Sequence, residues 1–370
     1  MAPLGKVSQQ QYAQVPLTED SFEAEKGEKN PRRPEKSSLS KYTIIASLIA
    51  AALVALVAVF ALGFASGYRS GGGALEAPAS SPQRSSNCTE PLIRKEWRSL
   101  SKEEKKSYLD AFQCFIDSPS QLGMNGSLYD DFSWAHNLVA HSNHGKAPFL
   151  TWHRRFIWVY ENTLRKTCGY EGALPFWDWS LDWEDLPGSL IFDSKLGFGG
   201  DGDPKTPKYK HNHCVTDLPF KNLKPQWSGS FYDPHCLTRS FNDDGWIGHF
   251  VNPESLAEVL SKETYEEFFF ALEMRAHDII PTGVRGDFMA FTAPNDPIFY
   301  LHHSQLDRLW WLWQMRDKNV RVKEYGGMGD GKKNVTLSDK LPLAGLGKDI
   351  TVAEIMDTEG GDLCYRYMYT

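Results

Sequence analysis

The pattern of apolar and polar positions divides the chain into four parts. Residues 1–41 are polar and show no apolar periodicity, which predicts a disordered tail. Residues 42–66 are uncharged and mostly apolar, long enough for a helix of about 20 residues that crosses a bilayer. Residues 67–89 are rich in Gly, Ala, Pro and Ser, as is typical of a stalk. We therefore expect a membrane anchor followed by one folded domain, residues 90–370.

Within that domain the pattern is mainly helical. Apolar residues recur at helical spacing, and Ser, Asp and Pro residues mark the helix starts. Helices are expected at residues 90–117, 133–140, 150–165, 255–276 and 296–316. Loops dominate residues 188–244, and short strands and loops fill the chain after residue 319. These features favour a mainly α fold built on a helix bundle.

The flanks of the apolar segment predict its orientation. Six Lys and Arg residues lie between positions 26 and 41, which favours a cytoplasmic N-terminus and a lumenal or extracellular domain in a single-pass membrane protein. Glycosylation sequons at Asn87, Asn125 and Asn334, and all six cysteines, follow the segment. An oxidising compartment then allows up to three disulfides, whose pairing the sequence leaves open. A cleaved signal peptide is the alternative, but the apolar run begins far from the N-terminus.

Charge and motif content exclude several function classes. The net charge of -7 gives no general attraction to nucleic acid, and no basic run with interleaved aromatics occurs in the folded domain. The chain also lacks the glycine-rich phosphate loop, the dinucleotide fingerprint and the nucleophile elbow of hydrolases. The remaining candidate chemistry lies in the histidines.

The 11 histidines are unevenly spread. His136, His141, His144 and His153 fall within 18 positions, among apolar and aromatic residues. Neutral imidazole is the commonest transition-metal ligand, so this density predicts a metal site. A second group contains the adjacent pair at 302 and 303. Neighbouring helical residues point in different directions, so we expect at most one of this pair to face a given metal.

Two segments around these histidines resemble the copper-site signatures of the tyrosinase family. The first runs from His144 to Glu161, and the second runs from Asp296 to Asp307. They occur in the family's order. Residues 168–170, 175–179 and 364–367 are similar to further family segments. The resemblance covers residues 90–370 and is strongest to short fungal tyrosinase-like proteins with an N-terminal membrane anchor.

The resemblance implies a mainly α fold: a four-helix-bundle copper core with long loops and few short strands. It also implies two copper ions, each bound by three histidines, with dioxygen as co-substrate and phenols or tyrosine side chains in peptides as substrates. The implied first-site ligands are His136, His144 and His153, with His141 in reserve. The implied second-site ligands are His277 and His303.

The second site departs from the family pattern at one position. A histidine is expected four residues after His277, and Pro281, which offers no lone pair to a metal, stands there. Asp278 or His249 could complete the site, or it could stay incomplete. For the remaining histidines, at 211, 213 and 235, we expect exposed surface positions.

Three aromatic and acidic side chains are expected close to the copper ligands. Trp152 and Phe299 should wall the metal pocket. Asp307 lies four residues after His303, so it should pair with an arginine or orient an imidazole.

Three functional hypotheses follow. The first is a copper-dependent oxidoreductase that oxidises phenols with two coupled coppers and a completed second site. The second is an oxidoreductase remodelled to tailor a peptide natural product by hydroxylation, oxidation or crosslinking, alongside partner enzymes of a biosynthetic pathway. The third is a non-catalytic copper-binding or partner-assisting protein, because Pro281 replaces an expected ligand.

Overall fold

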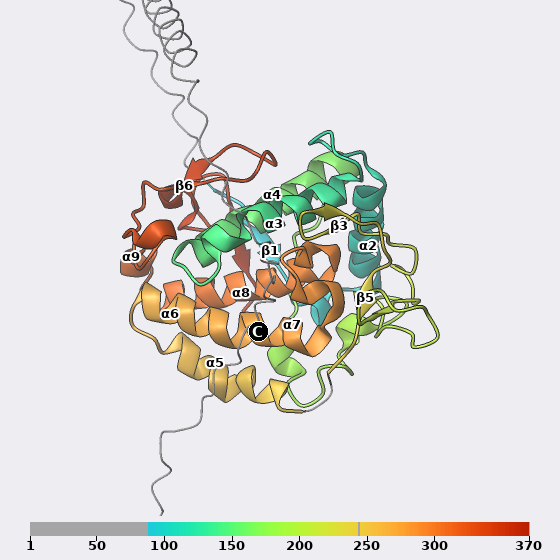
Figure 1. The fold of residues 1–370 in the computed structure, drawn as a ribbon. Coiled ribbons are helices and arrows are strands. Elements are labelled where there is room, and N and C mark those ends of the chain that lie inside the picture. Colours follow the sequence, from blue (N-terminus) through green and yellow to red (C-terminus); the bar gives the residue numbers. More distant parts are fainter. Residues whose placement is uncertain (1–87, 243–244, 370) are drawn as a thin grey trace, which may run out of the picture. The chain divides into compact units, whose positions relative to one another are not determined.

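The computed structural model describes residues 88–242 and 245–369 (Figure 1). The predicted tail 1–41, the predicted membrane segment 42–66 and nearly all of the predicted stalk lie outside these residues. Within the described residues, no helix is both long and apolar enough to cross a bilayer. Residues 82–370 form one compact unit.

Helices dominate the described part of the chain, which confirms the predicted mainly α fold with few short strands. The helices are α2 (Lys102–Asp117), α3 (Leu128–Asn143), α4 (Pro148–Cys168), α5 (Pro253–Leu260), α6 (Tyr265–Leu272), α7 (Asp278–Val284), α8 (Ile298–Met315) and α9 (Lys318–Arg321). The strands pair two by two: β1 (Leu92–Arg94) with β8 (Tyr365–Tyr367), β2 (His213–Cys214) with β5 (Thr238–Arg239), β3 (Trp227–Ser228) with β4 (Phe231–Tyr232), and β6 (Lys340–Leu341) with β7 (Ile350–Thr351).

Local sequence fixes where the site-bearing helices begin. Ser127 caps α3 through a reciprocal pair of hydrogen bonds with Asp130, so this helix starts five residues before the predicted position 133. Pro148 occupies the first turn of α4, where its missing N–H costs nothing. The α4 helix ends at Gly169, whose backbone is left-handed.

Aromatic side chains pack the helices together. In Figure 1, α3 and α4 (green) run across the helices α6, α7 and α8 (yellow to orange), and α4 contacts α8, α2 and α3. Tyr160 of α4 stacks on Tyr300 of α8 with ring centroids 3.6 Å apart. Trp310, Trp311 and Trp313 are also buried, as expected for core packing behind His303.

A buried network of charges anchors α4 and α8 below the histidines. Asp307 accepts hydrogen bonds from Arg94, Arg154, Tyr365 and Tyr367. Buried charges are tolerated only when paired in this way. The structure therefore places Asp307 in an arginine and tyrosine network, one of the two roles predicted for it.

Three disulfides lie within the described residues, as many as the six cysteines allow. They join Cys88 to Cys364, Cys114 to Cys168 and Cys214 to Cys236. The first ties β1 to β8 at the two ends of the domain, and the second ties α2 to the end of α4.

The predicted helix over residues 255–276 is interrupted. Its first half ends at Leu260, and a new capping box at Thr264 starts α6. The chain then widens into a π-helical turn, η5 (Glu273–His277), that leads directly into α7. Pro281 lies inside α7, so the helix continues through this proline. The π-turn aims His277 into the domain from a position that regular helical spacing would not give.

Candidate metal centre

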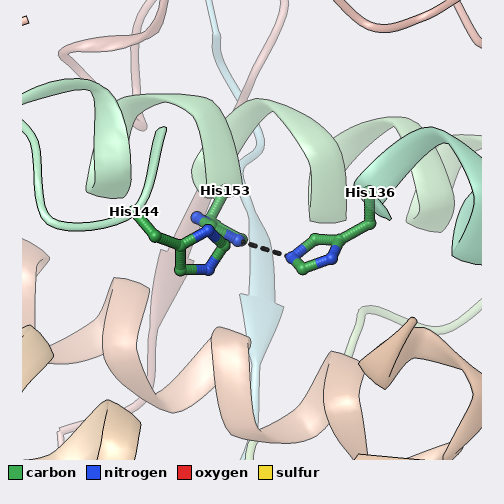
Figure 2. Close-up of side chains that lie close together, drawn as sticks. All are labelled: His136, His144 and His153. Atoms are coloured by element: carbon green, nitrogen blue, oxygen red, sulfur yellow. Dashed lines mark hydrogen bonds between the residues drawn. The ribbon is translucent and has the colours of Figure 1, made fainter. Parts of the chain in front are cut away.

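Three histidines from two helices converge at the first site. His136 projects from α3, His144 follows the end of α3, and His153 projects from α4 (Figure 2). One nitrogen atom from each lies within 4.8 Å of the others. The structure thus brings together the three residues that the family resemblance implied.

Backbone carbonyls fix the orientation of all three rings. The Nδ1 atoms of His136, His144 and His153 bind the carbonyl oxygens of Phe291, Ala140 and Phe149 at 2.7, 3.0 and 2.8 Å. A carbonyl oxygen can only accept, so each Nδ1 carries the proton. Each Nε2 therefore keeps its lone pair, the state in which imidazole binds a metal.

The contact between two of these rings indicates a cation. The Nε2 atoms of His136 and His153 face each other at 3.1 Å (Figure 2), with no proton between two neutral rings in these tautomers. Burial lowers the pKa of His136 to about 4 and lowers the pKa of His153 well below its usual range. Protonation therefore does not relieve the repulsion between the lone pairs, whereas a metal ion shared by the trio does.

A second trio faces the first. One nitrogen atom each of His277, His302 and His303 lies within 4.8 Å of the others. The prediction that at most one of residues 302 and 303 would face a given metal was wrong. Their side chains leave α8 about 100° apart, but the three rings form a triangle. The ring centroid of His277 lies 5.7 Å from His302 and 5.2 Å from His303, and those of His302 and His303 are 5.2 Å apart.

His302 completes the second trio, whereas Pro281 offers no lone pair to a metal. Both residues line the same cavity, and His302 is fully buried with neither ring nitrogen hydrogen-bonded. An unpaired buried polar atom costs about 1–3 kcal/mol, so these nitrogens fit a metal better than an apolar core. The sequence did contain a signal for this residue. His302, which had no assigned role, stands next to His303 in a site that lacked one histidine.

The other two members of the second trio also have nitrogen atoms suited to a metal. Asp278 accepts a hydrogen bond from His277 Nδ1 at 2.9 Å, which leaves Nε2 free. The Nδ1 of His303 has no partner. Burial lowers the pKa of both His302 and His303 well below the usual value, so both rings are neutral at pH 7. Copper, whose preferred protein ligands include imidazole, fits both trios.

The two trios open into one cavity of about 540 Å³, within the roughly 300–1,000 Å³ range of small-molecule sites. His153 and His303, from different trios, stack with ring centroids 4.2 Å apart. Phe299 lines the cavity, as predicted. Trp152 lies behind it, fully buried, with its ring centroid 4.9 Å from that of His153.

One acidic residue of the cavity was missed in the sequence. Glu273 lines it and is buried, and its Oε1 atom accepts a hydrogen bond from Gly145 N at 2.7 Å, while its Oε2 atom has no partner. Burial raises its pKa to about 8, so this carboxyl group can hold or release a proton near neutral pH. Its position one turn before His277 could have marked it.

The remaining histidines lie outside both trios. His141 packs against Phe291, with ring centroids 4.6 Å apart, and His249 is exposed. His211 is exposed as predicted, and His213 is half-buried with Nδ1 bound to a carbonyl. The prediction of an exposed surface position was wrong for His235, which is buried because Asp287 accepts its Nε2 hydrogen bond at 2.8 Å.

Two of the three predicted sequons fall on described residues. Asn125 and Asn334 are both exposed, as an attached glycan requires. Asn87 lies outside the described residues.

Comparison with known proteins agrees with this arrangement. Residues 126–316 match the family profile described as the common central domain of tyrosinase. The tyrosinase-like protein phomQ2 of Diaporthe leptostromiformis is 43% identical, covering 76% of this chain and 74% of its own. The tyrosinase ustQ of Aspergillus flavus is 44% identical, covering 76% of this chain and 80% of its own.

A solved structure shares the fold. A polyphenol oxidase from Thermothelomyces thermophila superimposes with a TM-score of 0.68 at 26% identity, covering 75% of this chain and 89% of that one. Two histidine trios at one cavity, the family profile and these relatives agree: the chain belongs to the tyrosinase family, whose members are copper-binding oxidoreductases.

Proposed function

We propose that this protein binds two copper ions, one in each histidine trio, and uses dioxygen to oxidise phenols or the tyrosine side chains of a peptide. The observation that carries the proposal is the shared cavity. Five of the six imidazoles, from η5 and the segments around α3 and α8, line it, and the trios approach each other at the stacked pair of His153 and His303.

The side chains of the cavity and the copper ions would have different roles in the reaction. Copper supplies the one-electron and dioxygen chemistry that no amino-acid side chain provides. The histidines would hold the metal, and four of them keep the Nδ1 proton on a fixed acceptor: His136, His144, His153 and His277. Phe299 and Phe291 form apolar walls, which exclude water from a bound phenol ring. Glu273 offers a carboxyl group that can take the phenolic proton within the cavity.

The overall reaction balances without another protein-bound group. Two catechols give up four electrons and four protons to one dioxygen molecule, which yields two quinones and two waters. Hydroxylation of a monophenol inserts one oxygen atom and consumes two electrons, which a catechol can supply. The same oxidising capacity can crosslink a tyrosyl peptide. Fungal relatives named as tyrosinases support the oxidation of phenols. The proposal includes a role in natural-product tailoring, alongside partner enzymes of a pathway.

We also propose that residues 42–66 anchor the protein in a membrane, with residues 1–41 in the cytoplasm and residues 90–370 in the lumen or outside the cell. The three disulfides and the exposed Asn125 and Asn334 support an oxidising, glycosylating compartment. Protease protection of sealed vesicles tests this orientation. Digestion of the folded domain from the cytoplasmic side would contradict it.

Copper content and oxygen uptake, measured on the same samples of the full-length chain, test the main proposal. We expect two copper ions per chain and oxygen uptake with tyramine and with a tyrosyl tripeptide. A His303→Ala variant should lose both the second copper and the uptake. The matched control is His211→Ala, which removes an exposed histidine outside both trios. Two bound coppers with no oxidation of any phenol would favour the non-catalytic alternative.

A further inference from the structure

The cavity lining contains acidic side chains but, among the described residues, no lysine or arginine. It includes five histidines, Met274, Thr282 and two acidic residues, Glu273 and Asp278. A negatively charged group on a substrate therefore finds no cationic side chain to pair with it inside this cavity.

Asp278 carries this charge at the entrance. Its side chain is 47% exposed, whereas Glu273 is buried deeper. Arg275 lies three residues before Asp278 in the sequence, and Lys146 follows the cavity residue Gly145. Both side chains already form ion pairs. Lys146 contacts Asp330 at 2.8 Å, and Arg275 contacts Glu258 at 2.6 Å. Neither is available to neutralise the Asp278 carboxylate.

Apolar side chains complete the entrance. Met274, Met289 and Phe291 line the cavity and are 51%, 56% and 42% exposed. Exposed apolar groups that gather at one cavity are typical of a binding surface, and methionine adapts to varied partners. The cavity is thus apolar and acidic at its mouth, with the histidines at its base.

We propose that this mouth selects phenols whose tail carries no carboxylate, and in particular a tyrosyl residue inside a peptide chain. In a peptide the tyrosine α-carboxylate is an uncharged amide, and the neighbouring residues lie against Met274, Met289 and Phe291. Phenylpropionic acids, which carry a carboxylate and no ammonium group, place an unpaired anion beside Asp278. This inference rests on the proposed function, because it specifies the substrate of the same cavity.

The size of the discrimination follows from the position of Asp278. The interaction between two unit charges is weak in water and stronger at a protein surface, and a half-exposed carboxylate lies between these limits. We therefore expect about a tenfold preference for a cationic tail over an anionic one at low salt, and a smaller one at high salt because screening weakens it.

Three ligands that share a phenyl ring but cannot be oxidised as phenols test this preference: phenethylamine, 3-phenylpropionamide and 3-phenylpropionate. Their dissociation constants are measured by calorimetry on the full-length protein, with the copper content determined in the same samples. We expect the amine to bind most tightly and the carboxylate most weakly, about tenfold apart. Equal affinities, or tighter binding of the carboxylate, would overturn the inference.

The decisive variant is Asp278→Asn, which removes the charge and keeps an oxygen that can accept the hydrogen bond from His277. The dissociation constant of 3-phenylpropionate should then exceed that of phenethylamine by about threefold or less. Asp110→Asn, which neutralises an exposed carboxylate on α2, is the matched control and should leave the ratio of these constants unchanged. An unchanged ratio in the Asp278 variant would remove Asp278 as the selecting group.

A second variant tests the apolar entrance. Met289→Gln keeps the approximate size of the side chain but makes it polar. We expect the affinity for the tripeptide Leu-Phe-Leu amide to fall about threefold to tenfold and the affinity for 3-phenylpropionamide to change little. Equal losses for both ligands would place the effect at the ring rather than at the flanking residues.

These binding measurements separate the two claims. A protein that prefers the amine but oxidises no phenol would leave charge selection intact and remove the proposed oxidation. A protein that oxidises tyramine and 3-(4-hydroxyphenyl)propionate with equal kcat/KM would leave the proposed function intact and remove charge selection.

Discussion

The two histidine trios reach similar geometry by different means. In the first trio every Nδ1 atom is bonded to a backbone carbonyl on or beside the core helices. In the second trio, His277 Nδ1 is bonded to the exposed side chain of Asp278, and no ring nitrogen of His302 is hydrogen-bonded. The backbone holds the first site, whereas the second site depends on one surface carboxylate and on the metal itself.

This difference predicts unequal behaviour of the two coppers. Carbonyl acceptors are part of the folded chain, so the rings of the first trio are oriented before the metal arrives. In the second trio, no hydrogen bond fixes the tautomer of His302 or His303 before the metal binds, and the ordering of these two rings weakens binding. We therefore expect the second copper to be released first and to be more sensitive to substitutions around it.

Removing one ligand from each trio should have the largest effect. His153→Ala and His303→Ala should each lower kcat by more than about 100-fold, beyond the 10–100-fold range of supporting groups. They should differ in copper retention. His303→Ala should leave one tightly held copper per chain, whereas His153→Ala should leave only the more weakly held one, as measured by metal analysis after dialysis against a chelator. Equal retention in both variants would contradict the proposed inequality.

Loss of the carboxylate beside His277 should have the next largest effect. Asp278→Ala removes the acceptor that orients this ring, so the second copper should bind about 10–100-fold more weakly while the first is unchanged. Copper dissociation during a chelator titration, followed by metal analysis, measures both constants. Asp278→Asn is the control because its amide oxygen still accepts the hydrogen bond, and it should retain most of the affinity. If the first copper weakened equally, the comparison between the trios would fail.

A paired substitution tests whether His302 fills the position left by Pro281. His302→Asn should weaken the second copper by about tenfold or more. Adding Pro281→His, which restores the spacing of four from His277, should recover part of that loss, because both residues line the cavity. Copper retention after dialysis is the readout, with Pro281→Ala in the His302→Asn background as the control. If Pro281→Ala recovered as much copper, relief of the proline rather than a new ligand would be responsible.

The sequence could predict the first trio better than the second, for a physical reason. The residues of the first trio belong to a motif and to regular helices, so linear spacing nearly determines their geometry. His302 was set aside because adjacent helical residues diverge, and the π-turn at Glu273–His277 that compensates left no signal in the periodicity. Capping boxes mark the helix starts after Ser101, Ser127 and Thr264. The predicted start at 133 and the uninterrupted helix predicted over 255–276 therefore missed a local signal.

The error at His235 has a different cause. The loop-rich segment suggested an exposed histidine, but Asp287, 52 residues later, lies beside it and shares its carboxylate with Thr238. Long-range partners of this kind are invisible to local patterns. This histidine also provides a useful contrast with the trios, because its pKa is shifted in the opposite direction.

Both ring nitrogens of His235 face acceptors, the Asp233 carbonyl at 2.6 Å and Asp287 at 2.8 Å. Burial opposes a charge on this ring, but the hydrogen bond and charge of Asp287, with the Asp233 carbonyl, outweigh it and raise the pKa of His235. No trio histidine is hydrogen-bonded to two oxygen acceptors in this way. Burial lowers the pKa of His136 to about 4. The charged form of this side chain is therefore favoured in the loop segment, and the neutral form is favoured at the metal centre.

The smallest expected effect is the dependence of stability on this charge. A raised folded pKa means that the charged pair contributes stability below the unfolded value of about 6.5, and that this contribution disappears as the pH rises through the folded pKa. The free energy of unfolding of the wild type should exceed that of His235→Gln by about 1–3 kcal/mol at pH 5.5 and by less at pH 8.5. Urea unfolding at both pH values measures the difference, with His211→Gln as the exposed control. A gap that grew with pH would mean that His235 is neutral in the folded protein, so the contrast with the trios would reduce to a difference in hydrogen-bond partners.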